Sequence, residues 1–114
     1  MSLIDGDIDY RFQEDITVLK LLKYIDGTYD QHYAQAKTQT TEIAFEQGHG
    51  EGFCMGNIIK YTQRFGKKKG KNTVDLYKII HYAIILLGHM DKESNEALET
   101  ELREYQEQMA VDQD

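Results

Sequence analysis

A group of positively charged side chains in the middle of the sequence is the first candidate for chemistry. Six cations and no Asp or Glu lie between Phe53 and Lys71, although the whole chain has a net charge of −7. They are Lys60, Arg64, Lys67, Lys68, Lys69 and Lys71. Arginine binds phosphate oxygens through two parallel hydrogen bonds, and lysine supplies a point charge. The group predicts an anion-binding site, with a solvated basic turn as the alternative.

Two helices are expected to position these cations. The loop of residues 66–72 contains Gly66 and Gly70, and it separates an expected helix at residues 52–65 from another at residues 73–90. Three polar or basic residues of the first helix share one face because they stand at i, i+3 and i+7. These three are Asn57, Lys60 and Arg64. The face therefore continues the basic group into the helix.

The second of these helices begins with its own polar signals. Asn72 is a typical N-cap residue, and Asp75 stands in the first turn, where the helix dipole favours a carboxylate. If the two helices form an antiparallel hairpin, Arg64, the loop lysines and Asp75 gather at one end. The alternative is that Asp75 serves as a helix-start residue alone.

The rest of the chain predicts an all-α fold. There is no proline, and apolar residues recur mostly at intervals of three and four. We expect one domain, residues 1–114, folded as a small bundle of four to five helices. The expected helices are residues 13–26, 40–47, 52–65, 73–90 and 94–109. Gly27 should end the first helix, and the polar residues 28–39 should form a loop or an extended segment.

Apolar stripes predict which side of each helix faces the core. The first helix has Val18, Leu21, Leu22 and Ile25, and the helix at 52–65 has Met55, Ile58, Ile59, Thr62 and Phe65. The helix at 73–90 has Leu76, Ile79, Ile80, Ala83, Ile84 and Leu87, with Ile85 and Leu86 outside that stripe. Two buried sides imply that this last helix is central or lies at a subunit interface, which favours a homo-oligomer.

The acidic end of the chain holds a different kind of helix. Leu98, Leu102, Tyr105 and Met109 have heptad-like spacing in the expected helix at 94–109, among acidic residues. Such a narrow seam suits either a partner helix or the helix's own domain. Residues 91–114 carry nine acids against two cations, a net charge of −7. This charge argues against duplex nucleic acid as a partner.

Composition excludes further classes of protein. No apolar run reaches the roughly 18 residues of a membrane span, and the acidic N-terminal residues do not resemble a secretory signal. We therefore expect a cytoplasmic protein that does not bind membranes. The single cysteine, Cys54, cannot form an intrachain disulfide, and its apolar neighbours predict a packed thiol.

Known phosphate and zinc motifs are absent. The string GKKKGKNT is not a Walker A loop, because its glycines are four residues apart and Lys71 is followed by Asn72. The four histidines do not have the spacing of zinc ligands. The adjacent pair His32 and Tyr33 offers a titratable donor beside an aromatic ring, on which a base could stack. The alternative is a packed tyrosine with an exposed histidine.

Three stretches in order resemble a family of small phage-encoded domains of unknown function. They are the pair HY, the string QTTEIAFEQGHGEGFCMGNIIKYTQRFGKK and the string DLYKIIHY, within about residues 30–88. The matching residues are His32, Tyr33, Glu42, Phe53, Cys54, Gly56, Asn57, Lys60, Tyr61, Arg64, Asp75, Leu76, Lys78 and Tyr82. A podovirus member of this family phosphorylates deoxynucleoside monophosphates without a P-loop. The resemblance implies the same activity here, in the cytoplasm of a bacterial host.

The first functional hypothesis is therefore phosphoryl transfer from ATP or another nucleoside triphosphate to a (deoxy)nucleoside monophosphate. The candidate catalytic residues are Lys60, Arg64 and Asp75. The candidate substrate-binding residues are His32, Tyr33, Asn57, Tyr61, Lys67, Lys68, Lys69 and Lys78. Asp75 and Glu42 are the candidate ligands of Mg²⁺, which prefers carboxylate oxygens and water.

Two alternatives belong to other functional classes. A non-catalytic protein could use the same anion site to sequester a nucleotide or to modulate a host enzyme. An all-α nucleotide pyrophosphohydrolase would need several acids clustered around Mg²⁺, and the sequence has no such cluster near the basic loop.

Overall fold

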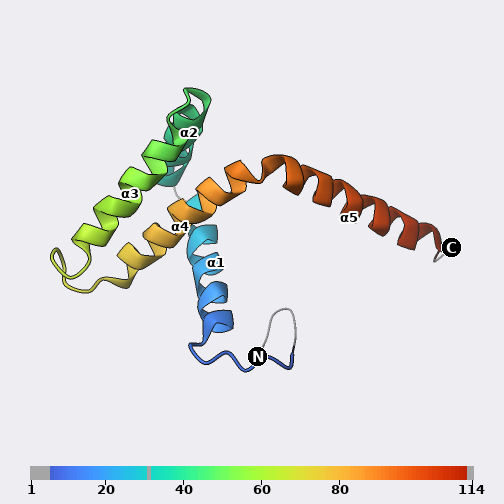
Figure 1. The fold of residues 1–114 in the computed structure, drawn as a ribbon, viewed down its shortest axis with the longest axis horizontal. Coiled ribbons are helices and arrows are strands. Elements are labelled where there is room, and N and C mark those ends of the chain that lie inside the picture. Colours follow the sequence, from blue (N-terminus) through green and yellow to red (C-terminus); the bar gives the residue numbers. More distant parts are fainter. Residues whose placement is uncertain (1–5, 31, 113–114) are drawn as a thin grey trace.

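The computed structural model describes residues 6–30 and 32–112, and the side chains of all of these except residues 32–34, 93 and 112. Its regular structure is entirely helical over these residues, which confirms the predicted all-α class (Figure 1). The five helices are α1 (Glu14–Asp30), α2 (His32–Glu46), α3 (Gly50–Arg64), α4 (Thr73–Met90) and α5 (Lys92–Asp112). None of them is both long enough and apolar enough to cross a membrane, within the residues searched.

The antiparallel hairpin of α3 and α4 is the centre of the fold, as the sequence predicted (Figure 1). Its connecting loop closes through a hydrogen bond from the Gly66 amide to the Gly70 carbonyl at 2.9 Å. Both glycines have positive φ, 84° and 67°, which a residue with a side chain adopts at a cost. The Asn72 side chain accepts a hydrogen bond from the Val74 amide at 3.0 Å, so the predicted N-cap of α4 is confirmed.

The predicted boundary between the first two helices is wrong. Helix α1 continues through Gly27 to Asp30, and α2 begins at His32, so residues 28–30 and 32–39 are helical and do not form the predicted loop. The hydroxyl groups of Thr28 and Thr41 donate hydrogen bonds to helix carbonyls three and four residues earlier, at 2.7 and 3.0 Å. Polarity therefore does not interrupt the helix here, because these side chains find partners within it.

The buried face of α3 also differs from the prediction. Cys54 is fully buried and Tyr61, seven residues later, is 3 % exposed. Of the predicted stripe, Ile58 and Phe65 are half-buried, whereas Met55, Ile59 and Thr62 are exposed. The buried stripe follows the contact with α4, where Tyr82 joins Cys54 and Tyr61 in one cluster. The packed thiol predicted for Cys54 is confirmed, and burial raises its pKa.

Helices α1 and α4 bury one side each. In α1, Leu21 is buried and Ile25 half-buried, whereas the predicted core residues Val18 and Leu22 are exposed. In α4, Ile79, Ile85 and Leu86 pack against the central cluster, although the last two were placed outside the stripe. The exposed members of the predicted α4 stripe are Leu76, Ile80, Ile84 and Leu87. A single chain therefore covers one of the two apolar sides of α4.

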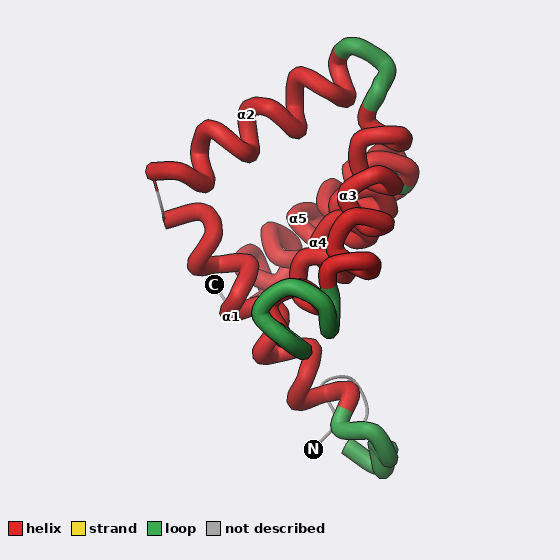
Figure 2. Tube along the Cα trace, turned by 90° about the vertical axis from the view of Figure 1, so that its left-hand side faces the viewer, coloured by secondary structure: helices red, strands yellow, loops and turns green. Residues whose placement is uncertain are grey.

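The molecule is elongated, with principal extents of 59 × 41 × 25 Å. Helices α1 and α2 run in different directions, and α2 leads back to α3 (Figure 2). Helix α5 extends the predicted segment 94–109 at both ends and projects away from the other helices (Figure 1).

Candidate functional site

A cavity of about 540 Å³ lies between α1, α2 and α4. Its walls combine aromatic rings with hydroxyl and charged groups. They include Tyr24, Thr28, Lys37, Thr41, Glu42, Phe45, Lys78, His81, Tyr82 and His89. Concave sites of about 300–1,000 Å³ with mostly apolar walls and a few polar groups are typical of small-molecule binding. The cavity is thus the best candidate for a ligand site.

Three lysines from three helices converge beside this cavity. The Nζ atoms of Lys78, Lys60 and Lys37 lie 4.8, 5.0 and 6.0 Å from the centroid of the Tyr61 ring. Lys37 also lies 5.6 Å from the centroid of the Tyr82 ring. None of the three ammonium groups pairs with a carboxylate among the described residues. We call these residues, with Tyr61 itself, the Tyr61 cluster.

The Tyr61 hydroxyl is the acidic group of this cluster. Burial by itself would raise its pKa, but the charges of Lys37, Lys78 and Lys60, with a hydrogen bond from Lys78, together hold the pKa below its ordinary value. The aromatic ring is fixed by a stacked contact with Tyr82, whose ring centroid is 6.3 Å away at 15° between planes. The cluster is therefore a rigid patch of positive potential, able to stabilise an anion.

Aromatic contacts build the wall of the cavity on the α1 side. Tyr24 stacks on Tyr77 with ring centroids 5.2 Å apart, and His81 meets the Tyr24 ring edge-on at 6.4 Å. Burial, and then the charge of Lys37, lowers the pKa of His81. His81 is consequently biased towards the neutral form, which can both donate and accept a hydrogen bond.

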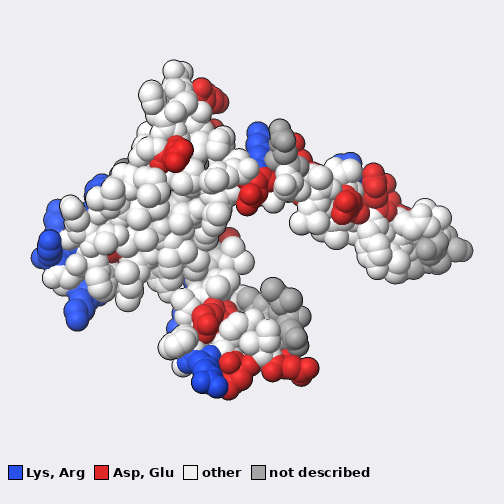
Figure 3. Space-filling model, in the orientation of Figure 1, with Lys and Arg blue, Asp and Glu red and all other residues white. Residues whose placement is uncertain are grey.

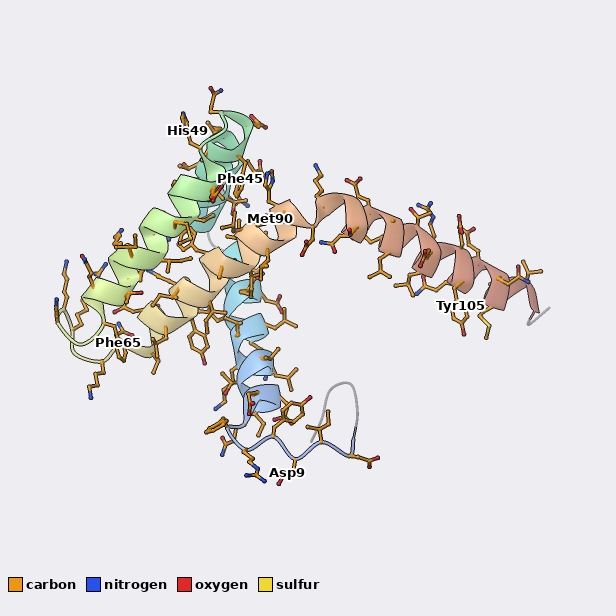
Figure 4. All side chains as sticks on the ribbon, viewed as in Figure 1. Asp9, Phe45, His49, Phe65, Met90 and Tyr105 are labelled. Carbon is orange, nitrogen blue, oxygen red and sulfur yellow. The ribbon has the colours of Figure 1, made fainter. Side chains whose placement is uncertain are left out.

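Phe45 and His89 form the other end of the wall. Their ring centroids are 4.3 Å apart, and Figure 4 shows Phe45 on α2 close to the end of α4. A side chain at Gly50 would overlap the Phe45 ring, so the start of α3 holds this ring in place. The sequence GHG at residues 48–50 thus serves a packing function as well as a turn.

A family model matches residues 10–84 of the chain, and its description is a protein of unknown function, DUF3310. The chain belongs to the DUF3310 family. The matched residues include α1, α2 and α3 and most of α4, and therefore all helices of the Tyr61 cluster. Neither the curated proteins nor the solved structures contain a significant match to this chain.

The DUF3310 domain brings together three of the residues singled out by sequence. Lys60, Tyr61 and Lys78 meet in the Tyr61 cluster, and Glu42 lines the adjacent cavity. The loop cations Lys67, Lys68 and Lys69 are exposed at the end of the hairpin and do not line the cavity (Figure 3). Arg64 is half-buried in the last turn of α3, next to that loop.

Asp75 has an unusual environment for a candidate metal ligand. It is 4 % exposed, and its Oδ2 atom is buried without a hydrogen-bond partner among the described residues. It does not line the cavity that contains Glu42. Within the described residues no three His, Cys, Asp or Glu side chains gather as metal ligands would. The assignment of Asp75 and Glu42 to Mg²⁺ stays a prediction.

The remaining predicted residues have mixed positions. Asn57 is half-buried and its Nδ2 donates to the Phe53 carbonyl at 2.9 Å, so its amide nitrogen is engaged within α3. His32 and Tyr33 begin α2, but their side chains lie outside the described residues. Their predicted contact with a base is therefore not tested.

Sequence reasoning missed Lys37, the α2 member of the cluster. Residues 28–39 were expected to lack helical structure, so Lys37 had no assigned face. The missed signal is the i, i+4, i+8 spacing of Lys37, Thr41 and Phe45, all of which line the cavity. The aromatic walls formed by Tyr24 and His81 have no comparable local signal, because these residues come from different helices.

Proposed function

We propose that this DUF3310 protein binds a nucleotide in the cavity between α1, α2 and α4. It would transfer a phosphoryl group to a (deoxy)nucleoside monophosphate, with ATP or another nucleoside triphosphate as the donor. The observation that carries the proposal is the convergence of Lys37, Lys60 and Lys78 on Tyr61. As for the phage-encoded domains that the sequence resembles, we expect action in a bacterial host's cytoplasm.

Electrostatics supports an anion with more than one charge. Three ammonium groups around one ring repel each other, and no described carboxylate pairs with them. A phosphate ester would offset this repulsion and accept hydrogen bonds from the ammonium groups. In its protonated form the Tyr61 hydroxyl adds a neighbouring donor.

The aromatic walls support a nucleoside beside the phosphates. Tyr24 and His81 form one wall of the same cavity to which Lys37 and Lys78 contribute. A flat base can stack on such rings, and a neutral imidazole can hydrogen-bond to its edge. The cavity volume of about 540 Å³ has room for one nucleotide.

Phosphoryl transfer requires alignment and charge neutralisation more than covalent chemistry from the protein. In the proposal Lys60 and Lys78 hold the transferred group and Arg64 neutralises the donor's outer phosphates, while the exposed loop lysines add only a weak, solvent-screened attraction. Glu42 on the cavity wall would contribute a carboxylate to hold Mg²⁺, which would offset the negative charge of the phosphates. The role of Asp75 as catalyst requires its buried carboxylate to become accessible.

The direct test is transfer of labelled phosphate from ATP to each deoxynucleoside monophosphate in the presence of Mg²⁺. We expect product from the native chain, and a loss of at least about tenfold in Lys60→Gln, which lacks one charge-assisted contact. Lys20→Gln, on an exposed position of α1, is the matched control and should keep full activity. Absence of nucleotide binding in calorimetry would disprove the proposal.

A second candidate function is non-catalytic nucleotide binding. It is favoured by the position of Asp75, which is buried and away from the cavity lining. In that case the native chain binds nucleotides stoichiometrically, and Lys60→Gln weakens binding, but no labelled product forms. The same two measurements therefore separate an enzyme from a protein that sequesters nucleotides or modulates a host enzyme.

A further inference from the structure

Helix α5 carries an apolar seam that the described residues of its own chain leave uncovered. Leu98, Leu102, Tyr105 and Met109 stand at i, i+4, i+7 and i+11 and are 42–64 % exposed. Among the described residues, α5 packs against α4 alone, where the two helices join. Tyr105 projects from α5 clear of the other helices (Figure 4). We call these four residues the α5 seam.

Helix α4 carries a second uncovered stripe. Leu76, Ile80, Ile84 and Leu87 stand at i, i+4, i+8 and i+11 and are 37–58 % exposed. They lie on the side away from Tyr82, which faces α3. This stripe, the α4 stripe, spans eleven residue steps, as does the α5 seam. Both are therefore about 17 Å long at about 1.5 Å per residue, and one can lie along the other.

The surface area of the chain shows that far more of it is exposed than in a compact chain of the same mass. The accessible surface is 9371 Å², whereas a compact chain of 13.3 kDa exposes about 6,500 Å². The radius of gyration of 17.8 Å exceeds the value of about 13 Å expected for 114 residues. A stable interface needs about 800 Å² from each partner, and the excess surface is well above that.

Charge identifies the partner. Residues 91–114 have a net charge of −7, and residues 53–71 have +6. Acidic side chains line α5, and basic side chains gather at the loop end of the hairpin, next to the start of the α4 stripe (Figure 3). Two α5 helices paired side by side would bring like charges together, which is destabilising. An α5 laid on a second chain's α4 instead brings acids towards lysines.

We propose that two copies of this chain form a dimer by reciprocal exchange of α5. The α5 seam of each copy lies on the α4 stripe of the other, and its acidic side chains approach the lysine loop of that copy. The same pair of surfaces is used twice, so the assembly closes with twofold symmetry. The proposal concerns assembly and does not depend on nucleotide binding.

The first test is the mass of the full chain in solution by light scattering after gel filtration. We expect twice 13.3 kDa for the native chain. The paired changes Leu98→Gln/Leu102→Gln and Ile80→Gln/Ile84→Gln should each give 13.3 kDa, because each removes one surface of both contacts. Substitution by glutamine leaves the net charge of the chain unchanged and keeps much of the helix propensity. All four residues are exposed, so the circular dichroism spectrum should be unchanged.

Two control variants place a single substitution of the same kind on other exposed apolar positions. Val111→Gln lies on α5 off the seam, and Ile59→Gln lies on α3; both should remain dimeric. Because the acids of one copy meet the lysines of the other, high salt should lower the measured mass of the native chain towards 13.3 kDa.

A mixing experiment tests the exchange itself. The α5 variant keeps an intact α4 stripe, and the α4 variant keeps an intact α5 seam. Mixing the two monomeric variants should therefore restore one of the two contacts and give a dimer weaker than the native one. A monomeric native chain, or an α4 variant that stays dimeric through paired α5 helices, would overturn the proposal. So would a native mass above two copies, or a mixture that remains monomeric.

Discussion

The molecule has two basic regions of opposite character. The Tyr61 cluster takes Lys37, Lys60 and Lys78 from three helices, and its charges surround a ring that is 3 % exposed. The loop at residues 66–72 has four lysines within five positions of the sequence, all exposed. The loop has more cations per residue of sequence, whereas the cluster has more cations close to the cavity.

This comparison shows that proximity in sequence is a poor measure of electrostatic effect. Lysine side chains in a loop can point into the solvent and move apart, so each is solvated independently. The lysines of the cluster come from three helices that meet around the buried Tyr61 ring, so their spacing is set by the packing of these helices. Lys37 and Lys78 are half-buried and Lys60 is exposed, and charge interactions are stronger where water is partly excluded. The cluster should therefore dominate both stability and ligand affinity, although the loop is the more conspicuous basic feature.

The largest expected difference between the two regions is in stability. Tyr61→Ala removes a buried ring that stacks on Tyr82, and it should cost about 3–5 kcal/mol in the free energy of unfolding. Lys68→Ala in the exposed loop should cost less than about 0.5 kcal/mol. Urea unfolding followed by circular dichroism measures both. Similar costs for the two variants would mean that the cluster is not part of the core.

Nucleotide affinity should follow the same order. Each charge-assisted hydrogen bond contributes about 1.5–3 kcal/mol, so Lys37→Gln/Lys78→Gln should weaken binding of ATP or dTMP by about 100-fold or more. Lys67→Gln/Lys68→Gln should weaken it by less than about fivefold, because exposed pairs contribute about 0–1 kcal/mol. Lys20→Gln/Lys23→Gln on exposed positions of α1 is the control of equal charge.

Isothermal titration calorimetry on the three double variants decides this comparison. A larger loss from the loop pair than from the cluster pair would move the phosphate site to the hairpin end. An equal loss from all three pairs would show that net charge alone governs binding.

The cavity wall allows a prediction from two glycines on one helix. Gly50→Ala places a methyl group against the Phe45 ring and should destabilise the chain by about 1–3 kcal/mol. Gly52→Ala meets nothing within 4 Å and should stabilise α3 by up to about 1 kcal/mol. Thermal unfolding should thus give midpoints that move in opposite directions. If both midpoints rise, Phe45 is not packed against α3.

The smallest expected effect is the pH dependence of stability. The pKa of Tyr61 is lower in the folded chain than in the unfolded chain, where it is about 10. The resulting stabilisation is complete above the unfolded pKa and disappears as the pH falls through the folded pKa. The native chain should therefore gain stability over Tyr61→Phe as the pH rises towards about 10.

For Tyr24→Phe, the pH dependence of the stability difference from the native chain should have the opposite sign. Burial, and then the charge of Tyr61, raises the pKa of Tyr24, so the native chain should lose stability relative to Tyr24→Phe as the pH rises through the unfolded value. Urea unfolding of the three proteins between neutral pH and pH about 11 measures both slopes, because the loss caused by Tyr24 begins near its unfolded pKa of about 10 and continues above it. Equal slopes for the two variants would contradict the electrostatic description of the cluster.

Local signals in the sequence were sufficient for the hairpin and insufficient for the helices before it. The bounds of α4, Thr73–Met90, agree with the prediction because Asn72 caps the helix with its own side chain. The start of α2 could not be predicted, because its polar residues have weak helix preferences and the helix is stabilised by packing against α1 and α3. The predicted end of α1 at Gly27 is also wrong. Gly27 does not have the positive φ of a glycine that ends a helix, and the helix continues through it.

The choice of buried face needed the partner helix. Aliphatic residues of α3 suggested a stripe through Met55 and Ile59, yet both remain exposed. Cys54 and Tyr61 are buried instead, because the Tyr82 ring of α4 packs against this side of α3. Tyr82 stacks on Tyr61, and Phe53 meets the Tyr82 ring edge-on with centroids 6.0 Å apart. Aromatic packing across two helices outweighs the aliphatic periodicity of one.

The amino-acid sequence by itself determined the helical class, the hairpin turn and the segregation of charge into a basic middle and an acidic end. These depend on side chains within a few residues of each other, and local propensity, capping and Coulomb interactions act over that range. Tertiary structure alone decided that Lys37, Lys60 and Lys78 meet at Tyr61 and that Asp75 is buried. The reason is that the packing of helices distant in sequence sets which charges lie close together and which are removed from water.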